Sequence, residues 1–246
     1  MANSLTALSG RNTMTVAARE FRGYFNNPAV YIVLVAATFF VALLFWVSFF
    51  LVNRTSVREM FGYMSWSLMF AAPALTMGLL AEEKRSGTLE ILITMPLREM
   101  EVIGGKYLAA LGVLGVFLLC TLPIPISVST LGDLDWGPVF AGYFGIFLEG
   151  AALMAIGLAV SSFTSSQLVA LFVSFFISII LVILITALLP FIPTGLTSIA
   201  EWLSFQRHTE AMARGVIDTR DVVFFLSIAG FALMVAFRAL ESRRWS

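Results

Sequence analysis

Charged side chains are scarce in this sequence. Only 12% of the 246 residues are Asp, Glu, Lys or Arg, whereas 59% are hydrophobic and the mean hydropathy is +0.94. Soluble domains carry about 25% charged and about 45–50% apolar residues, so a soluble fold with a polar surface is excluded. The net charge of zero says little about partners, and no nucleic-acid partner is expected. The composition predicts a protein whose solvent is a bilayer.

Cysteine and histidine occur once each. Cys120 cannot form a disulfide or a zinc cluster within the chain, and we expect it to pack among apolar residues. His208 is expected to be a solvated or hydrogen-bonded residue rather than a metal ligand. Neither an H-E-x-x-H motif nor a Ser/His arrangement is present, which disfavours an intramembrane hydrolase. We expect no catalytic residue, no metal site and no cofactor in this chain.

Long apolar runs are abundant, and six of them approach the roughly 20 residues that cross the hydrocarbon core. Helices are expected because a helix satisfies its own backbone polar groups in lipid, and the alternation typical of a membrane β-barrel is absent. The fold class is therefore an all-α polytopic membrane protein. The predicted spans are residues 29–52, 61–80, 106–131, 139–160, 168–189 and 222–239.

The distribution of lysine and arginine predicts the orientation of these spans. With both termini in the cytoplasm, ten of the 15 basic residues fall on the cytoplasmic side, as the positive-inside rule favours. Residues 1–28 have no apolar core followed by a small-residue cleavage site, so we expect no signal peptide. The five basic residues on the outer side are Arg54, Arg58, Arg207, Arg214 and Arg220.

Two further segments have an amphipathic pattern. Residues 12–28 place Met14, Ala17 and Phe21 on one helical face, which predicts a helix lying at the headgroups; an ordinary cytoplasmic lead-in is the alternative. Residues 191–221 are too polar to span the membrane and too apolar for a free linker, so we expect an external re-entrant helical segment. The side chains expected to dip into the outer leaflet are Ile199, Trp202, Leu203 and Phe205.

The connection between the second and third spans contains "AEEKRSGTLEILITMP", residues 81–96. Its spacing predicts a short amphipathic helix over 86–95, which Pro96 ends. A helix of this length is marginal alone in water, so it must pack on the headgroup region or on a cytoplasmic partner. Gly104 and Gly105, just before the third span, can serve as a flexible joint or as a close-packing pair.

One ionisable side chain is predicted to lie deep in the membrane. Glu149 falls near the middle of the fourth span, where a charge is costly and a function is the default hypothesis. The carboxyl could bind a proton or a cation, or line a substrate route. It could equally be a protonated group that hydrogen-bonds Ser or Thr on a neighbouring helix.

The stretch "EEKRSGTLEILITMPLREMEVIGGKYLAAL" resembles a signature of type-2 ABC transporter permeases, E-x-x-x-G-T-L-E-x-L-x-x-x-P followed by G-K. Three further segments, "LGDLDWGPVFAGYFG", "MAIGLAVSSFTSSQLVA" and "HTEAMARGVIDTRDVVFFLS", resemble the branch with the gliding-motility-associated and nitrous-oxide-reductase-maturation permeases. The residues that match the signature are Glu83, Gly87, Thr88, Leu89, Glu90, Leu92, Pro96, Gly105 and Lys106.

The resemblance implies a permease subunit of the bacterial cytoplasmic (inner) membrane, whose 86–95 segment is a coupling helix docked on a separate ATP-binding subunit. Leu89, Leu92, Ile93 and Met95 would fill the partner's cleft, and Lys84, Arg85 and Glu90 would contact its rim. The implied docking set is Lys84, Arg85, Ser86, Gly87, Thr88, Leu89, Glu90, Leu92, Ile93 and Met95.

The resemblance also implies a second permease chain, identical or related, and places ATP and Mg²⁺ on the partner subunits. The chain agrees in having no G-x-x-x-x-G-K-[ST] phosphate loop. Two functions follow: an exporter of amphipathic cargo, or a mechanical relay for an envelope machine that would need an auxiliary periplasmic or membrane protein. A channel or secondary transporter would predict inverted repeats and several midplane polar residues, which are not found.

Overall fold

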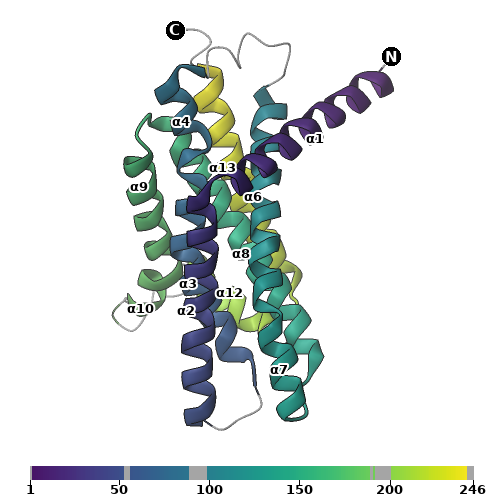
Figure 1. The fold of residues 1–246 in the computed structure, drawn as a ribbon, viewed down its shortest axis with the longest axis vertical. Coiled ribbons are helices and arrows are strands. Elements are labelled where there is room, and N and C mark those ends of the chain that lie inside the picture. Colours follow the sequence, from purple (N-terminus) through teal and green to yellow (C-terminus); the bar gives the residue numbers. More distant parts are fainter. Residues whose placement is uncertain (1, 53–55, 89–98, 189–190, 192–200, 243–246) are drawn as a thin grey trace.

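Helices make up all the regular structure in the part of the chain that the computed structural model describes, residues 2–52, 56–88, 99–188, 191 and 201–242. Figure 1 shows the long helices running along one common axis, with α1 leaving the bundle at an angle. In chain order the elements are α1 (Ala2–Asn26), α2 (Pro28–Val52), α3 (Arg58–Thr76), α4 (Gly78–Ser86), α6 (Glu99–Thr121), α7 (Pro123–Leu131), α8 (Trp136–Phe163), α9 (Gln167–Ile179), the π-helix η1 (Ile180–Leu184), α10 (Ile185–Leu188), α12 (Phe205–Met212) and α13 (Thr219–Glu241).

Among the described residues, six helical stretches are long and apolar enough to cross a membrane, which confirms the predicted number. The second and third extend further toward the α4 end of the bundle than the apolar runs predict. Charged residues continue the helices there, since the backbone hydrogen bonds do not stop where the apolar side chains stop. The six stretches are Pro28–Leu51, Arg58–Ser86, Glu99–Leu131, Trp136–Phe163, Gln167–Leu188 and Thr219–Glu241.

Helices α3 and α8 form the centre of the bundle, and most of their side chains are buried. Glycines of α8 allow this close approach. A Cβ on Gly142 would lie 2.3 Å from a ring carbon of Phe61, and one on Gly157 would lie 2.0 Å from Thr76 Oγ1. Helix α13 also packs along α8, while α2, α9 and α13 turn many apolar side chains outward.

Prolines divide two of the spans. Pro73 lies within α3, four residues before the turn at Met77 that separates α3 from α4. Pro123 begins α7 after a turn at Leu122, because a proline has no N–H to continue the ladder of α6. Cys120, near this break, is exposed on the outer surface of an apolar span, so any packing of its side chain among apolar groups would be with lipid or another chain.

The N-terminal helix α1 covers the predicted interfacial segment and is followed at once by α2. Asn27 is the single residue between them. Its Oδ1 accepts the N–H of Ala29 at 3.0 Å and so caps the start of α2. Val16 and Ala17 of α1 are buried, whereas Met14, expected on the same apolar face, is 67% exposed. The buried side of α1 lies against α6, so this helix is held by the protein itself.

The segment before α13 folds back onto the bundle. Phe205, the first residue of α12, is fully buried and packs edge-on against Phe225 with ring centroids 5.2 Å apart. The expectation that Phe205 dips into the outer leaflet is therefore wrong, because its ring completes the protein core. Trp202 is 60% exposed, while Ile199 lies outside the described residues. His208 is hydrogen-bonded, with Nδ1 2.6 Å from Asp221 Oδ1.

Candidate functional site

Helix α4 ends in a basic turn that is closed by glycine. Gly87 has a φ of 73°, in the left-handed region, and its N–H donates to the carbonyl of Lys84 at 3.4 Å. Ser86 still belongs to α4, and its hydroxyl lies 2.8 Å from that of Thr88. The predicted helix over 86–95 therefore cannot begin at Ser86. A new helical direction becomes possible only from Thr88 onward.

Two of the predicted rim residues, Lys84 and Arg85, have different surroundings. The ammonium of Lys84 donates to the carbonyl of Ser162, near the end of α8, and so ties α4 to the central helix. Arg85 is exposed. Binding of a partner by either residue stays a prediction. The other predicted contacts, Leu89, Glu90, Leu92, Ile93 and Met95, lie outside the described residues.

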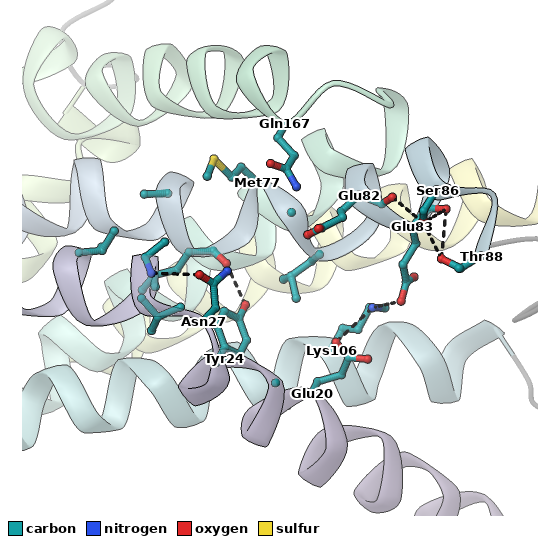
Figure 2. A pocket seen from close by; sticks show the side chains of 18 residues that line it. Glu20, Tyr24, Asn27, Met77, Glu82, Glu83, Ser86, Thr88, Lys106 and Gln167 are labelled. Carbon is teal, nitrogen blue, oxygen red and sulfur yellow. Dashed lines mark hydrogen bonds and ion pairs between the residues drawn. The ribbon is translucent and has the colours of Figure 1, made fainter.

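A buried ammonium joins three helices below this turn. Lys106 of α6 is 1% exposed; its Nζ lies 2.7 Å from Glu83 Oε1 of α4 and 3.3 Å from Glu20 Oε2 of α1. Figure 2 shows Lys106 and Glu83 joined across the space between their helices, with Glu20 beside them. A buried charge is stable only with such partners. The two helices that flank the 87–98 connection are thus linked at its base.

Glycines of α6 let α1 approach this base closely. A Cβ on Gly105 would lie 2.6 Å from Cγ1 of Val16, and one on Gly112 would lie 2.8 Å from a ring carbon of Phe21. Both distances are shorter than carbon atoms tolerate. Of the two roles that the sequence left open for Gly104 and Gly105, the structure supports close packing for Gly105, which lies inside a continuous helix.

Tyr24 makes a second link from α1 to the bundle. Its hydroxyl donates to the carbonyl of Leu75 at 2.9 Å, close to the α3–α4 turn. Burial, and after it the negative charge of Glu20, raise the pKa of the Tyr24 phenol above its ordinary value. The hydroxyl therefore remains a neutral donor at physiological pH. Together with the ion pair at Glu20, it fixes the end of α1 against both α3 and α6.

A hollow of about 310 Å³ lies among these contacts and is open to the surroundings. In Figure 2, Lys106 and Glu20 lie on one side of it, and Glu82 and Gln167 on the other. The second carboxylate oxygen of Glu83 is buried and has no hydrogen-bond partner among the described residues. Carboxylates outnumber the ammonium in this lining, so the hollow favours hydrogen-bond donors and cations over anions.

The pairing of Lys106 with Glu83 and Glu20 escaped the sequence analysis. Lys106 is the first residue of the predicted third span, and Glu83 lies three residues after the predicted second span. The signal available was the occurrence of opposite charges at the same membrane boundary of consecutive spans, where an ion pair lowers the cost of burial. The closing role of Gly87 had a clearer signal, a glycine directly after a basic last turn.

Away from this site, Glu149 lies in the middle of α8 and is fully buried. The hydroxyl of Ser65 in α3 contacts Oε1, and that of Thr209 in α12 lies 2.9 Å from Oε2. Hydrogen bonds with serine and threonine of neighbouring helices belonged to one of the expected environments, and the structure shows them. The protonation of the carboxyl stays a prediction. A function for the carboxyl is a separate prediction.

Comparison with known proteins places the chain in a family. The sequence profile of the family described as ABC-2 family transporter protein matches residues 63–240, most of the chain and five of its six apolar helices. No curated protein matches the chain at a significant level. Members of this family are generally non-catalytic membrane components that pair with an ATP-binding subunit. With its six membrane-spanning helices, this chain belongs to the ABC-2 transporter family and is a multi-pass transmembrane component of an ABC transporter.

Proposed function

We propose that this chain is the permease of an ATP-driven exporter and that residues 88–95 dock on a separate ATP-binding subunit. The observation that carries the proposal is the Lys106–Glu83 ion pair of 2.7 Å, which links α4 and α6 at the base of the connection between them. Force applied to the docked segment would reach both helices together. Since α4 continues directly from α3 and α6 begins the third span, the second and third spans would both respond.

The proposed orientation places the docking segment in the cytoplasm of a bacterial cell, with the chain in the inner membrane. The end of α4, the start of α6 and the C-terminal end of α13 lie at one end of the bundle in Figure 1. This is also the end to which the positive-inside rule assigns ten of the 15 basic residues. The α12 end of the bundle then faces the outside.

The proposed complex has two permease chains, either two copies of this one or this one with a related chain, and two ATP-binding subunits. The apolar side chains exposed along α2, α9 and α13 require lipid or a second permease to cover them. ATP and Mg²⁺ would bind to the partner subunits, because this chain has no phosphate-loop sequence. The cargo class suggested by the family resemblance is a lipid-linked, glycan or other amphipathic molecule.

A mechanical relay with the same architecture is the second proposal. It is suggested by the resemblance to motility and maturation permeases, and it would need an auxiliary protein because only residues 132–135 separate α7 from α8 on the outer side. ATPase activity of the reconstituted complex distinguishes the two functions. An exporter should hydrolyse ATP faster when amphipathic cargo is added, whereas a relay should respond only to its auxiliary protein.

Co-purification tests the docking proposal. A tagged chain should retain the ATP-binding subunit, and the double change Leu89→Asp and Leu92→Asp should remove it, because two carboxylates cannot be buried in an apolar cleft. A matched control is the change of Val216 and Ile217 to Asp, since both are exposed in the connection between α12 and α13. If the subunit is retained after both changes at 89 and 92, residues 88–95 are not the docking segment.

A further inference from the structure

A polar cavity of about 440 Å³ lies between α2, α3 and α12, at the end of the bundle opposite α4. Its lining is unusual for a membrane-spanning bundle because hydroxyl, amide and carboxylate groups gather in it. The polar residues that matter here are Ser48, Glu59, Ser65, Gln206, Thr209 and Glu210. A cavity with this lining can hold water.

The hydroxyls of Ser65 and Thr209 separate the cavity from Glu149. Both hydroxyl residues line the cavity, and both contact the carboxyl, one at each oxygen. Glu149 itself is fully buried and does not line the cavity. A proton moving between the cavity and the carboxyl therefore has a path of hydrogen bonds through two side chains.

The hydrogen bonds of Thr209 suit two protonation states of Glu149. Its single hydroxyl hydrogen has two acceptors within reach, Glu149 Oε2 at 2.9 Å and the carbonyl of Phe205 at 3.1 Å. When Glu149 is ionised, Thr209 donates to Oε2. When Oε2 carries a proton, it donates to Thr209 Oγ1, whose own hydrogen turns to Phe205. Every group stays hydrogen-bonded in both states, so the site can gain or lose a proton without leaving a buried polar atom unsatisfied.

Among the described residues, no Lys, Arg or His forms an ion pair with Glu149. The charged groups of α3 and α12 that face the cavity are Arg58, Glu59 and Glu210, and they give it a net negative charge. A carboxylate buried at mid-membrane without a cation is costly, so the absence of a fixed cationic partner favours a proton as the neutralising group.

The other elements packed around α8 contribute no competing charge at Glu149. Asp221 of α13 is bound to His208, and Tyr107 of α6 donates its hydroxyl to the carbonyl of Ala151. Helices α2 and α9 contain no ionisable side chain except Tyr31, and α8 contains only Tyr143 besides Glu149. The charged groups of α4 lie near the end of α8, where the Lys84 ammonium donates to the carbonyl of Ser162. The environment of the carboxyl is thus set by its two hydroxyl neighbours and by the cavity beyond them.

We propose that Glu149 is a proton-binding site that exchanges its proton with the solution at the α12 end of the bundle, through the cavity and the hydroxyls of Ser65 and Thr209. Because the carboxyl joins α3 to α12, the bound proton changes the direction of the hydrogen bond that holds α12. This site goes beyond the docking of an ATP-binding subunit and does not depend on it.

Infrared difference spectroscopy of the purified full chain in lipid nanodiscs tests the site. A C=O stretching band of a protonated carboxyl should change in amplitude between about pH 5 and pH 9, the range in which buried carboxyl groups titrate, and should shift in D₂O. Glu149→Gln should abolish the band. Glu241→Gln, at the C-terminal end of α13 and outside the cavity, should leave the band in place.

The route is tested by the rate at which the band shifts after transfer to D₂O. Gly62 lines the cavity and has open space where a Cβ would be, so Gly62→Leu should fill the cavity and slow the shift several-fold. Gly230→Leu is the matched control, since Gly230 also has open space but lies in α13 away from the cavity. Thr209→Val should slow the shift and move the band to higher frequency, whereas Thr209→Ser should restore both.

Three results would overturn the proposal. The first is no protonated-carboxyl band at any pH in the unmodified chain, which would mean that the carboxyl stays ionised. The second is a band that neither pH nor D₂O changes, which would make Glu149 a permanently protonated structural group. The third is an unchanged exchange rate in both Gly62→Leu and Thr209→Val, which would exclude the path through the cavity.

Discussion

Lys106 is the buried cation between two carboxylates at the α4 end of the bundle, and its replacement should lower the stability of the protein. Lys106→Met keeps most of the length of the side chain but leaves the carboxylates of Glu20 and Glu83 without an ammonium between them. We expect the free energy of unfolding to fall by about 2–4 kcal/mol, because breaking a buried ion pair leaves an uncompensated charge. The lower part of this range applies since the carboxylates keep 18% and 21% of their surface exposed. Chemical denaturation in detergent micelles measures the change.

A surface cation gives the control for Lys106. Arg19 also pairs with Glu20, at 2.8 Å, but it is 59% exposed, so Arg19→Met should change the stability by less than about 0.5 kcal/mol. Adding Glu83→Gln to Lys106→Met should recover part of the loss, because one unpaired charge is then removed. Equal effects of Arg19→Met and Lys106→Met would contradict the role given to the buried ammonium.

Single residues differ in how far the sequence predicts them. The sequence alone identifies Glu149 as a residue that needs polar partners, because it is a carboxyl within an apolar run. Those partners, Ser65 and Thr209, are 84 and 60 residues away, and only the packing of helices brings them together. Lys106 has the same property: its charge is evident, but its burial depends on where α1 crosses α6.

At the scale of elements, the contact of α1 with α6 rests on small residues. Gly105→Ala would place a Cβ 2.6 Å from Cγ1 of Val16 and 3.0 Å from the carbonyl oxygen of Thr13. We expect α1 to be displaced and the stability to fall by about 1–3 kcal/mol, the usual cost of overpacking. Thermal unfolding and proteolysis of α1 in the folded protein measure the two effects.

Gly115 supplies the matched control in the same helix. No atom lies within 4 Å of a Cβ built on it, so Gly115→Ala should be neutral or slightly stabilising through helix propensity. Adding Val16→Ala to Gly105→Ala should recover part of the stability, since it removes the nearest carbon. If both alanine variants behave alike, the glycine is not what allows α1 to approach.

The location of a helix was predictable where one sequence pattern is enough to define it. Apolar length was enough to locate all six spans, because a bilayer of fixed thickness imposes the length. Ends were less predictable: the 86–95 prediction missed that Gly87 closes α4, since the amphipathic spacing runs through the break. The depth of Phe205 was also misjudged, because periodicity gives the face of a helix but not whether protein or lipid lies beyond it.

For the whole molecule, the orientation across the membrane can be measured with single cysteines in a Cys120→Ala background. A membrane-impermeant maleimide should label Val216→Cys in intact cells, since this exposed residue lies at the α12 end. Thr88→Cys and Ser242→Cys, also exposed, should react only after the membrane is permeabilised. The reverse pattern would invert the bundle and place the docking segment outside the cell.

The sequence alone does not show which helices pack against one another. The central position of α3 and α8 depends on glycines such as Gly142 and Gly157, which receive Phe61 and Thr76. A glycine in an apolar run does not say which neighbour approaches it. The number of spans was therefore predictable, while the surfaces available to a second permease chain depend on the packed structure.

Photo-cross-linking reports directly whether residues 88–95 contact the ATP-binding subunit. A photoreactive group attached to Leu92→Cys, in the Cys120→Ala background and in the assembled complex, should cross-link to that subunit. The same group on Val216→Cys, at the opposite end of the bundle, should not. Cross-linking from position 92 to lipid alone, in a complex that still contains the ATP-binding subunit, would contradict the account.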